Sequence, residues 1–509
     1  MLNVVSVQTM RDFDRCMIND VGIDGMLLME TAARAAAESV IKHEGRCVVL
    51  IGPGNNGGDG IALIRILKLL GREATGLLLC DPAKFRGDAL KNYQIAVKCG
   101  LPFTDETDCI KNADIIVDAV FGTGLSKSIE GKARQAIEIA NSSDAYRIAV
   151  DIPSGINGDT GEIMGIAFNA DETVTFQCIK RGLLLTKERE KIGKLITAPI
   201  AVPPEKYAET LEREQLIDFD FVNGLLPERK IVSNKGSYGK ALLIVGSAGM
   251  TGAAIMCANA CLRAGAGLTK VFAEEQTLNA LSAVPEIMTV RDITDGSENG
   301  NKNKTRNGNE DCEISDALYN ALEWADAVGI GCGTGNDKNI YKKLIAALKT
   351  GKPTVIDADG LNCMDEYAKS LLNENCIITP HPGEMARLIK KDTAYVLSDP
   401  VGIAERFANK YGCVVLLKSA VTVIAKPEKG SQSRIRYNTS GNTGLAKGGS
   451  GDTLTGIITA LLAQKLEPFD AASCGAYLLG TSAEEAYKLL KTRLLTASDA
   501  ADALALLIH

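Results

Sequence analysis

The stretch LIGPGNNGGDGIALIRIL, residues 50–67, joins a hydrophobic run to a glycine-rich loop and then to an apolar stripe at helical spacing. A strand, a glycine loop and a helix in this order can hold phosphate at the helix N-terminus. The loop is neither G-x-G-x-x-G nor a Walker A loop, because no Lys-Ser/Thr pair follows its last glycine. It also carries two asparagines and an aspartate, so its pattern leaves open what it holds.

Two further segments of the first half place carboxylates at the ends of expected strands. DAVFGTGLSKSIEG (118–131) opens with Asp118, and AVDIPSGINGDTG (149–161) contains Asp151 with Ser154 just beyond. Ligands of open parallel sheets bind beyond the carboxyl ends of the strands, so we expect these loops and the first one to converge. Their oxygens could hold a monovalent cation, or one carboxylate could act as an acid/base. Each aspartate could equally be a helix cap or a turn former.

In the second half, NTSGNTGLAKGGSGDTLTGIITALLAQ (438–464) brings Gly448, Gly449 and Gly451 up to Asp452 and an apolar helix. Successive backbone N–H groups at a helix start form an anion hole. An aspartate there can take a proton from a hydroxyl as phosphoryl transfer begins. The tetrapeptide G-S-G-D alone favours a simpler interpretation, in which Asp452 only caps the helix.

The elements that position these residues alternate between short apolar runs and helical patterns, which predicts α/β layering with parallel strands in both halves. A Pro pair and dense charge interrupt the pattern at 201–230, so we expect two domains joined around residues 205–230. Residues 294–313 are polar and without periodicity, which predicts a mobile surface insertion. The strand candidates are 47–51, 75–80, 114–120, 147–152 and 172–177 in the first half, and 326–331, 353–358, 375–379 and 413–418 in the second, whose series opens at 239–254.

Composition narrows the class of protein. A chain of 509 residues exceeds one ordinary core, and a net charge of −7 argues against nucleic acid as the main partner. No apolar run is long enough to span a bilayer, and the start lacks the pattern of a signal peptide, so we expect no membrane partner. The 14 cysteines include no C-x-x-C pair and are expected to be reduced thiols of a cytoplasmic protein. We also expect a homo-oligomer.

The segments GPGNNGGDG, DAVFGTGL and VDIPSGINGDTG together resemble the signature of the YjeF N-terminal domain, the NAD(P)H-hydrate epimerase, over most of residues 1–215. The resemblance implies a Rossmann-like three-layer domain with a parallel sheet, in which Asp151 is the acid/base. Lys127 lies where an arginine is expected, which keeps the charge but loses the planar fork. By the same resemblance Asn56, Asp118 and Ser154 would be potassium ligands, and the nucleotide would be contacted by Asn55, Asn56, Gly57, Gly58, Asp59, Gly122, Thr123, Gly124, Leu125, Ser126, Lys127, Ser128 and Asp151.

KGSYGKALLIVGSAGMTGAA, VIDADGLN, ITPHPGEMARL and GNTGLAKGGSGD resemble, in this order, the ribokinase-like YjeF C-terminal domain, the NAD(P)H-hydrate dehydratase, over roughly 230–509. We assign the two domains to residues 1–215 and 225–509. Cys332 replaces the usual proline and Ser450 the usual threonine, and neither change removes a group that the chemistry needs. His381, between two prolines, could equally be only a rigid turn. The resemblance implies that Ala253, Gly333, His381 and Asp452 contact the hydrated nicotinamide nucleotide, and that Lys418, Ser419, Ala420, Val421, Thr422 and Gly451 line the adenine-nucleotide site.

The two resemblances together imply one repair pathway for hydrated nicotinamide nucleotides. The first domain would epimerise R- and S-NAD(P)HX, with a potassium ion and the opening loop on the diphosphate side of the substrate. The second would dehydrate S-NAD(P)HX to NAD(P)H, using ADP with Mg²⁺ and giving AMP and phosphate; a bacterial fusion favours ADP over ATP. Two alternatives remain open: a ribokinase-like kinase of a vitamin precursor or sugar with an accessory nucleotide-binding domain, or a nucleotide sensor. Asp151 argues against the sensor.

Overall fold

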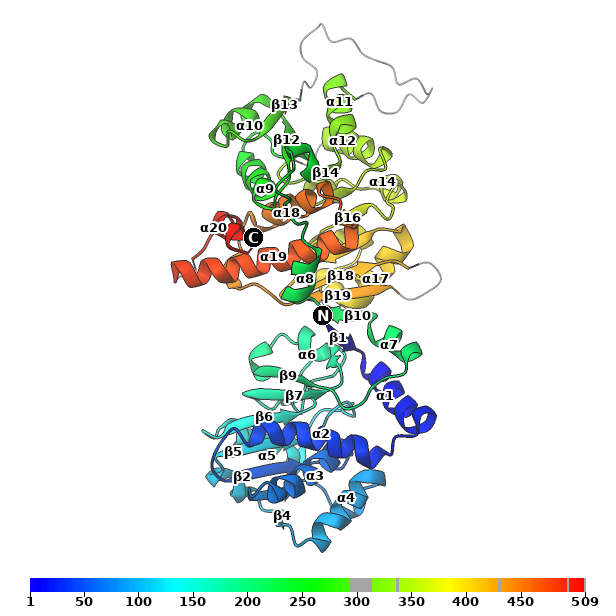
Figure 1. Cartoon of the computed structure of the whole chain (residues 1–509), viewed down its shortest axis with the longest axis vertical. Helices are drawn as coiled ribbons and strands as arrows, with labels where there is room; N and C mark the ends of the chain where they lie inside the picture. Colours follow the sequence, from blue (N-terminus) through cyan, green and yellow to red (C-terminus); the bar gives the residue numbers. More distant parts are fainter. Residues whose placement is uncertain (293–313, 336–337, 429–432, 492–493, 508–509) are drawn as a thin grey trace. The chain divides into compact units, whose positions relative to one another are not determined.

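The computed structural model describes residues 1–292, 314–335, 338–428, 433–491 and 494–507, and the chain divides into two compact units at Glu214 (Figure 1). The N-terminal unit comprises Leu2–Glu214 and the C-terminal unit Gln215–His509. The division lies inside the Pro-rich, charged stretch at 201–230. The polar insertion expected at 294–313 lies outside the described residues.

The N-terminal unit is built on a parallel sheet of seven strands in the order β4-β3-β2-β5-β6-β7-β9. Strand β1 (Leu2–Val5) pairs in parallel with β8 (Ile179–Lys180) outside this seven-stranded sheet. The strands of the sheet are β2 (Cys47–Ile51), β3 (Ala74–Leu78), β4 (Phe103–Thr104), β5 (Ile115–Ala119), β6 (Tyr146–Val150), β7 (Glu172–Phe176) and β9 (Lys194–Ala198). The helices are α1 (Val7–Cys16), the π-helical turn Met17–Val21, α2 (Gly25–Val40), α3 (Asn55–Leu69), α4 (Gly87–Lys98), α5 (Gly131–Asn141), α6 (Arg181–Leu185) and α7 (Glu205–Leu211).

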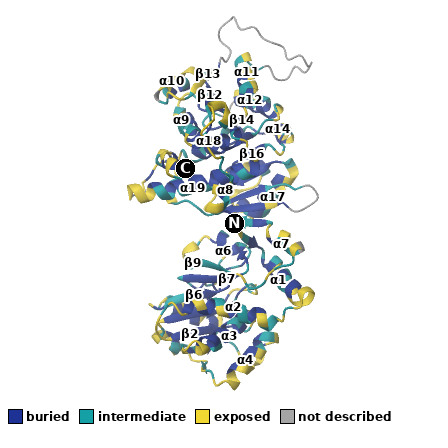
Figure 2. Cartoon of the chain, viewed as in Figure 1, coloured by how far each residue is buried: buried dark blue, intermediate teal, exposed yellow. Residues whose placement is uncertain are grey.

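Both faces of this sheet are covered, as the fully buried strand β2 requires. Val49 and Ile51 pack with helices α2, α3 and α4 into one core, whereas Val48 and Leu50 pack with α5 into the other. The alternation follows from the two-residue period of a strand. The result is the expected three-layer domain, in which the strands are buried and exposed residues gather on the outer helices and loops (Figure 2).

The C-terminal unit holds the strand order β13-β12-β11-β14-β15-β16-β17-β18-β19. The pairs from β13 to β17 are parallel, and β18 and β19 add an antiparallel hairpin that the sequence did not predict. The strands are β11 (Lys240–Ile244), β12 (Leu268–Ala273), β13 (Met288–Arg291), β14 (Ala327–Ile330), β15 (Thr354–Ile356), β16 (Cys376–Ile378), β17 (Val414–Leu417), β18 (Thr422–Lys426) and β19 (Arg434–Asn438), and the short β10 (Glu214–Leu216) lies at the division.

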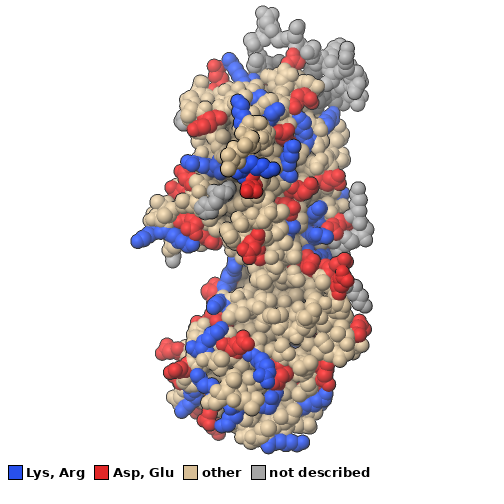
Figure 3. Space-filling view, in the orientation of Figure 1, with Lys and Arg blue, Asp and Glu red and all other residues tan. Residues whose placement is uncertain are grey.

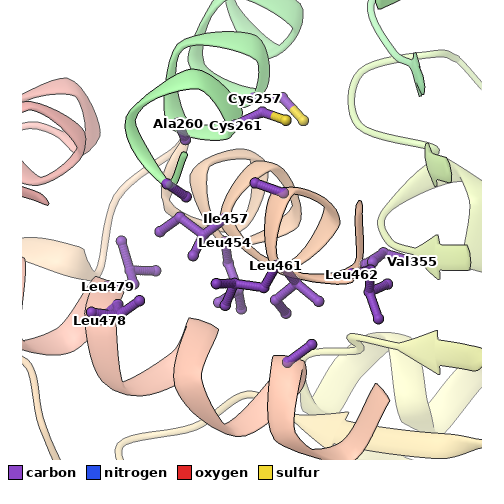
Figure 4. Close-up of a cluster of buried hydrophobic side chains, with 14 of the residues drawn as sticks. Cys257, Ala260, Cys261, Val355, Leu454, Ile457, Leu461, Leu462, Leu478 and Leu479 are labelled. Carbon is purple, nitrogen blue, oxygen red and sulfur yellow. The ribbon is translucent and has the colours of Figure 1, made fainter. Parts of the chain in front are cut away.

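Helix α18 (Ser450–Ala463) is buried around most of its circumference because its residues after the first turn are small or apolar. It packs against α9 (Thr251–Arg263) and α19 (Pro468–Leu490) (Figure 4). The contact with α9 is close at Gly456. The other helices are α8 (Phe219–Leu225), α10 (Glu275–Ala280), α11 (Asp316–Trp324), α12 (Lys338–Lys349), α13 (Asp359–Asn362), α14 (Glu366–Ser370), α15 (Pro382–Ile389), α16 (Thr393–Ser398), α17 (Pro400–Tyr411) and α20 (Ala497–Ala503).

The surface is of mixed charge. On the face drawn in Figure 3, acidic and basic side chains are interspersed in each unit, in keeping with the net charge of −7. Within the described ranges, every helix is too short or too polar to cross a membrane.

Candidate active sites

Asp151 follows strand β6 directly and is held in an unusual backbone conformation. Its φ of 67° lies in the left-handed region, which costs free energy for a residue other than glycine. Its N–H donates to the carbonyl of Val174 at 2.8 Å. Its Oδ1 accepts hydrogen bonds from the Lys180 ammonium and, at 3.2 Å, from the Thr175 hydroxyl. The strand-end position therefore does fix a carboxylate, as the sequence predicted.

The other oxygen of Asp151 faces the second glycine-rich loop. A β-carbon added at Gly122 would lie 3.1 Å from Asp151 Oδ2 and 3.3 Å from Asn56 Oδ1. Gly122 thus lets the first and third loops meet around it. The Asn56 side chain is buried, yet its Nδ2 has no hydrogen-bond partner among the described residues. Most buried polar groups have a hydrogen-bond partner, so this amide is a donor that a ligand could use.

A cavity of about 480 Å³ opens at this point in the N-terminal unit. Helices α1 and α2 supply further lining residues, among them Arg11 and Asp14. Leu125, Ser126, Lys127 and Ser128 do not line the cavity, and the last three are exposed. Of the substrate contacts implied by the resemblance, the cavity is lined by Asn55, Asn56, Asp59, Gly122, Thr123, Gly124 and Asp151.

Gly57 and Gly58 also lie outside the cavity lining, because the helix starts earlier than the glycine pattern suggested. Helix α3 begins at Asn55, so both glycines sit in its first turns. A β-carbon at Gly57 would lie 1.9 Å from the Gly52 carbonyl oxygen, and one at Gly58 would lie 2.8 Å from Met29. These two glycines permit close packing, while the asparagines beside them face the cavity.

Two further carboxyl groups, Asp14 and Asp59, line the same cavity. Burial raises the pKa of Asp14 to about 6, and Lys180 lowers it while Asp151 raises it. Burial also raises the pKa of Asp59 well above its ordinary value, and the charges of Asp151 and Asp14 add to that rise. Asp14 and Asp59 therefore retain protons at a higher pH than exposed aspartates would.

Asp118 and Ser154 form a second buried group next to this cavity. Asp118 Oδ2 accepts from the Ser154 N–H at 2.7 Å, and Oδ1 accepts from the Ser154 hydroxyl at 2.7 Å and from the Val120 N–H at 3.2 Å. The Phe121 N–H donates to Ser154 Oγ at 2.8 Å. Burial raises the pKa of Asp118 to about 6, against the effect of these hydrogen bonds.

This arrangement fits a monovalent cation. Asp118 is fully buried, and only N–H and O–H groups offset its charge, so a cation beside it would favour the ionised form. The structure brings Asp118 and Ser154 into direct contact. Asn56, the third expected ligand, lies against Gly122, next to the Phe121 that bonds to Ser154.

In the C-terminal unit, the glycine loop at 448–451 ends at the start of α18. Gly449, with a φ of 98°, is the N-cap, so Asp452 lies in the first turn rather than at the cap. Burial raises the pKa of Asp452, a hydrogen bond from the Cys332 thiol lowers it, and Asp357 raises it again. The capping interpretation of Asp452 is therefore not what the helix shows.

A buried ion pair lies beneath the same helix start. Asp357 follows β15, and its Oδ1 accepts from Lys418 Nζ at 2.7 Å, while Oδ2 accepts from the Thr455 hydroxyl at 3.1 Å. A β-carbon at Gly451 would lie 3.2 Å from Asp357 Oδ2 and 3.4 Å from Lys418 Nζ. The absence of a side chain at Gly451 thus leaves the Lys418 ammonium close to the amides of the expected anion hole.

The other residues of this unit that are expected to contact the nucleotides lie in three separate places. His381 is the N-cap of α15: its Nδ1 accepts from the Gly383 N–H at 3.0 Å, and its side chain is 52% exposed. Ala253 and Gly333 adjoin, since a β-carbon at Gly333 would lie 2.7 Å from that of Ala253. Lys418 to Val421 form the turn from β17 to β18 and Thr422 begins β18, with Ser419 and Ala420 exposed.

Sequence reasoning missed Lys180, Asp14 and Asp357. Lys180 and Asp357 each end a short apolar run, FQCIK and TVID, and that position was the available signal. Asp14 gave none, because a charged residue in an amphipathic helix is ordinarily solvated.

Both units match described protein families. Residues 25–182 match the family described as YjeF-related protein N-terminus, and residues 241–505 match the family described as NAD(P)H-hydrate dehydratase. Structures similar to the C-terminal part include a ribokinase-like protein of Enterococcus faecalis (28% identity, TM-score 0.49, 58% of this chain and 96% of that chain). Another is an ADP/ATP-dependent NAD(P)H-hydrate dehydratase of Bacillus subtilis (27% identity, TM-score 0.47, 58% and 97%).

Curated relatives match nearly the whole chain. The bifunctional NAD(P)H-hydrate repair enzyme of Moorella thermoacetica is 34% identical, over 98% of this chain and 95% of the relative. The enzyme of the same name from Escherichia coli is 35% identical, over 93% and 87%. The chain therefore belongs to the family of bifunctional NAD(P)H-hydrate repair enzymes.

Proposed function

We propose that the chain repairs hydrated nicotinamide dinucleotides. The N-terminal unit interconverts the R and S epimers of NAD(P)HX, and the C-terminal unit dehydrates the S epimer with ADP as the phosphoryl donor. The observation that carries the proposal is the match at 34% identity to a relative named as a bifunctional NAD(P)H-hydrate repair enzyme, because this match runs through both units. It favours this function over a vitamin-precursor or sugar kinase and over a sensor.

In the N-terminal unit, Asp151 would move the proton that epimerisation at C6 of the nicotinamide ring requires. Its Oδ2 borders the cavity, and the amide of Asn56 beside it has an unused donor. Asn56, Asp118 and Ser154 would hold a potassium ion, which would offset the negative charge of the bound dinucleotide. Arg11, at the edge of the cavity, would add a second positive charge there.

In the C-terminal unit, Asp452 would accept the proton of the C6 hydroxyl as that oxygen attacks the β-phosphate of ADP and releases AMP. Hydroxide is a poor leaving group, whereas the resulting phosphate is a good one. The ring nitrogen lone pair would then expel phosphate, and loss of the C5 proton would restore the double bond. The amides of Gly448 to Gly451 and the Lys418 ammonium would steady the transferring group, and Mg²⁺ would neutralise the ADP phosphates.

We place the two domains at residues 1–215 and 225–509 and the reaction in the cytoplasm, and we expect a homo-oligomer. Cysteines without a C-x-x-C pair suit a reducing compartment. A net charge of −7 suits small-molecule partners better than nucleic acid.

The proposal is tested on mixed NADHX epimers with and without ADP. Recovery of the full reduced-nicotinamide absorbance with ADP, at a rate above the spontaneous epimerisation, supports both activities. If only the absorbance that corresponds to the S epimer is recovered, the result supports dehydration without epimerisation. Consumption of ADP with a stable phosphorylated product would favour the kinase, and binding without turnover would favour the sensor.

A further inference from the structure

Lys180 is a fully buried lysine at the end of β8, and each of the three N–H groups of its ammonium donates a hydrogen bond. Its side chain is 1% exposed. Its Nζ donates to Asp151 Oδ1, to Thr175 Oγ1 at 3.1 Å and to the Phe176 carbonyl oxygen at 2.9 Å. A buried ammonium is costly unless its donors are used, and here three acceptors match three N–H groups. The ammonium is therefore fixed in position.

The bonding divides the two oxygens of Asp151 into different roles. Oδ1 accepts from both Lys180 and Thr175, which leaves it little capacity for a substrate. Oδ2 has no hydrogen-bond partner in the described part of the chain, and it faces the Gly122 backbone across the space that a β-carbon would fill. Asp151 and Lys180 both line the cavity. One oxygen is thus anchored and the other is presented to the ligand.

We propose that Lys180 is a positioning residue of the epimerase: by anchoring Oδ1 of Asp151, it makes Oδ2 the atom that transfers the proton. The inference rests on the proposed function. Asp151 has a left-handed φ of 67°, a conformation that persists only where the surroundings hold it. The Lys180 and Thr175 bonds hold the side chain, and the Val174 carbonyl holds the backbone.

A second effect of Lys180 is to hold down the proton affinity of the carboxyl cluster. Its charge lowers the pKa of both Asp14 and Asp59, each of which is raised chiefly by burial. Removing the ammonium would leave three neighbouring carboxyl groups with no cation between them. Asp14 and Asp59 would then take up protons at a higher pH than in the wild type.

A purely structural role would have different consequences, and the next residue supplies the control. Arg181 pairs with Glu214 through Nε at 3.0 Å and through Nη2, and its side chain is 22% exposed. The pair does not line the cavity. Arg181→Met removes a cation from a half-buried pair and tests stability alone.

The experiment follows epimer equilibration by chromatography without ADP, so that the dehydratase is silent. Lys180→Met should lower kcat about 100-fold or more, with KM within about threefold, because the proton-transferring atom is misplaced while the cavity persists. Thr175→Val, which removes one bond to Oδ1, should lower kcat about tenfold. Arg181→Met should keep the wild-type kcat.

A double-mutant cycle keeps the test decisive if Lys180→Met folds poorly. Asp151→Asn with Lys180→Met removes both partners of the ion pair, and its rate should equal that of Asp151→Asn alone, because Lys180 positions the proton-transferring oxygen only through Asp151. A further loss in the double variant, an unchanged kcat in Lys180→Met, or an equal loss in Arg181→Met would overturn the inference. An inactive wild type would instead refute the proposed function.

Discussion

At the residue scale, Asp151 is the side chain on which the epimerase depends. Asp151→Asn keeps an oxygen that can accept from Lys180, so the fold should persist, but it removes the proton-transferring carboxylate. Epimerisation should fall by about a hundred- to ten-thousandfold, while dehydration of purified S-NADHX should be unchanged. Both rates are measured on one preparation. Near-normal epimerisation in this variant would refute the assignment.

Asp452 is the corresponding group of the dehydratase. Asp452→Asn keeps an acceptor for the Cys332 thiol and leaves the glycine amides and Lys418 in place, so ADP affinity should be unchanged. The amide cannot take a proton, and dehydration should fall by several orders of magnitude. Calorimetric ADP binding and the dehydration rate are compared on the same variant. A retained rate, or loss of ADP binding together with the fold, would count against the base role.

Asp14 links the same cavity to stability. The unfolded chain ionises this carboxyl near 3.8, whereas burial raises its folded pKa to about 6. Asp14 therefore contributes stability that is full below pH 3.8 and is lost as the pH rises through about 6. Asp14→Asn does not titrate, so its Tm advantage over the wild type should grow between about pH 4 and pH 6 and stay level above. Thermal melts across this range would contradict the prediction if the difference were independent of pH.

At the element scale, the contact between α9 and α18 depends on Gly456. A β-carbon there would lie 2.1 Å from the Cys257 carbonyl oxygen, so Gly456→Ala must push the helices apart. We expect a loss of roughly 1–3 kcal/mol in the free energy of unfolding of the C-terminal unit. Gly252→Ala in α9 has nothing within 4 Å and should be neutral or stabilising by up to about 1 kcal/mol. Denaturant titration of both variants checks the contrast, and equal stabilities would contradict the close packing.

The sequence predicted the elements that carry local signals. Every strand candidate lies within two residues of an observed strand, because a buried parallel strand is a continuous apolar run bounded by turns. Asp118 and Asp151 were found because the end of such a run is itself a signal. The hairpin β18–β19 was missed, since no tight turn signal joins the two runs.

The partners of these aspartates could not be predicted in the same way. The bond from Lys180 to Asp151 spans 29 residues and that from Lys418 to Asp357 spans 61, so only the fold brings them together. Helix starts were also misplaced, because the glycines of α3 and α18 permit close helix packing as well as loops. Helices α3 and α18 begin at Asn55 and Ser450, inside the glycine-rich segments.

At the scale of the whole molecule, each unit has its own buried core and its own candidate site. The product of the first reaction is the substrate of the second, so the two sites need only share a solution. This independence predicts that the two activities can be supplied by different copies of the chain.

An equimolar mixture of Asp151→Asn and Asp452→Asn tests that independence. Alone with ADP, Asp151→Asn should dehydrate the S epimer of mixed NADHX quickly, and the R epimer only as fast as it epimerises spontaneously. Asp452→Asn alone should dehydrate almost none of either epimer. Together they should reach full conversion, because S-NADHX made by one copy diffuses to the dehydratase of another. Absorbance recovery is compared with wild-type protein at half the total protein concentration of the mixture. That wild-type sample contains the same number of intact epimerase sites and intact dehydratase sites as the mixture. A mixture that stayed at the S share would show instead that the epimer passes between sites of one chain.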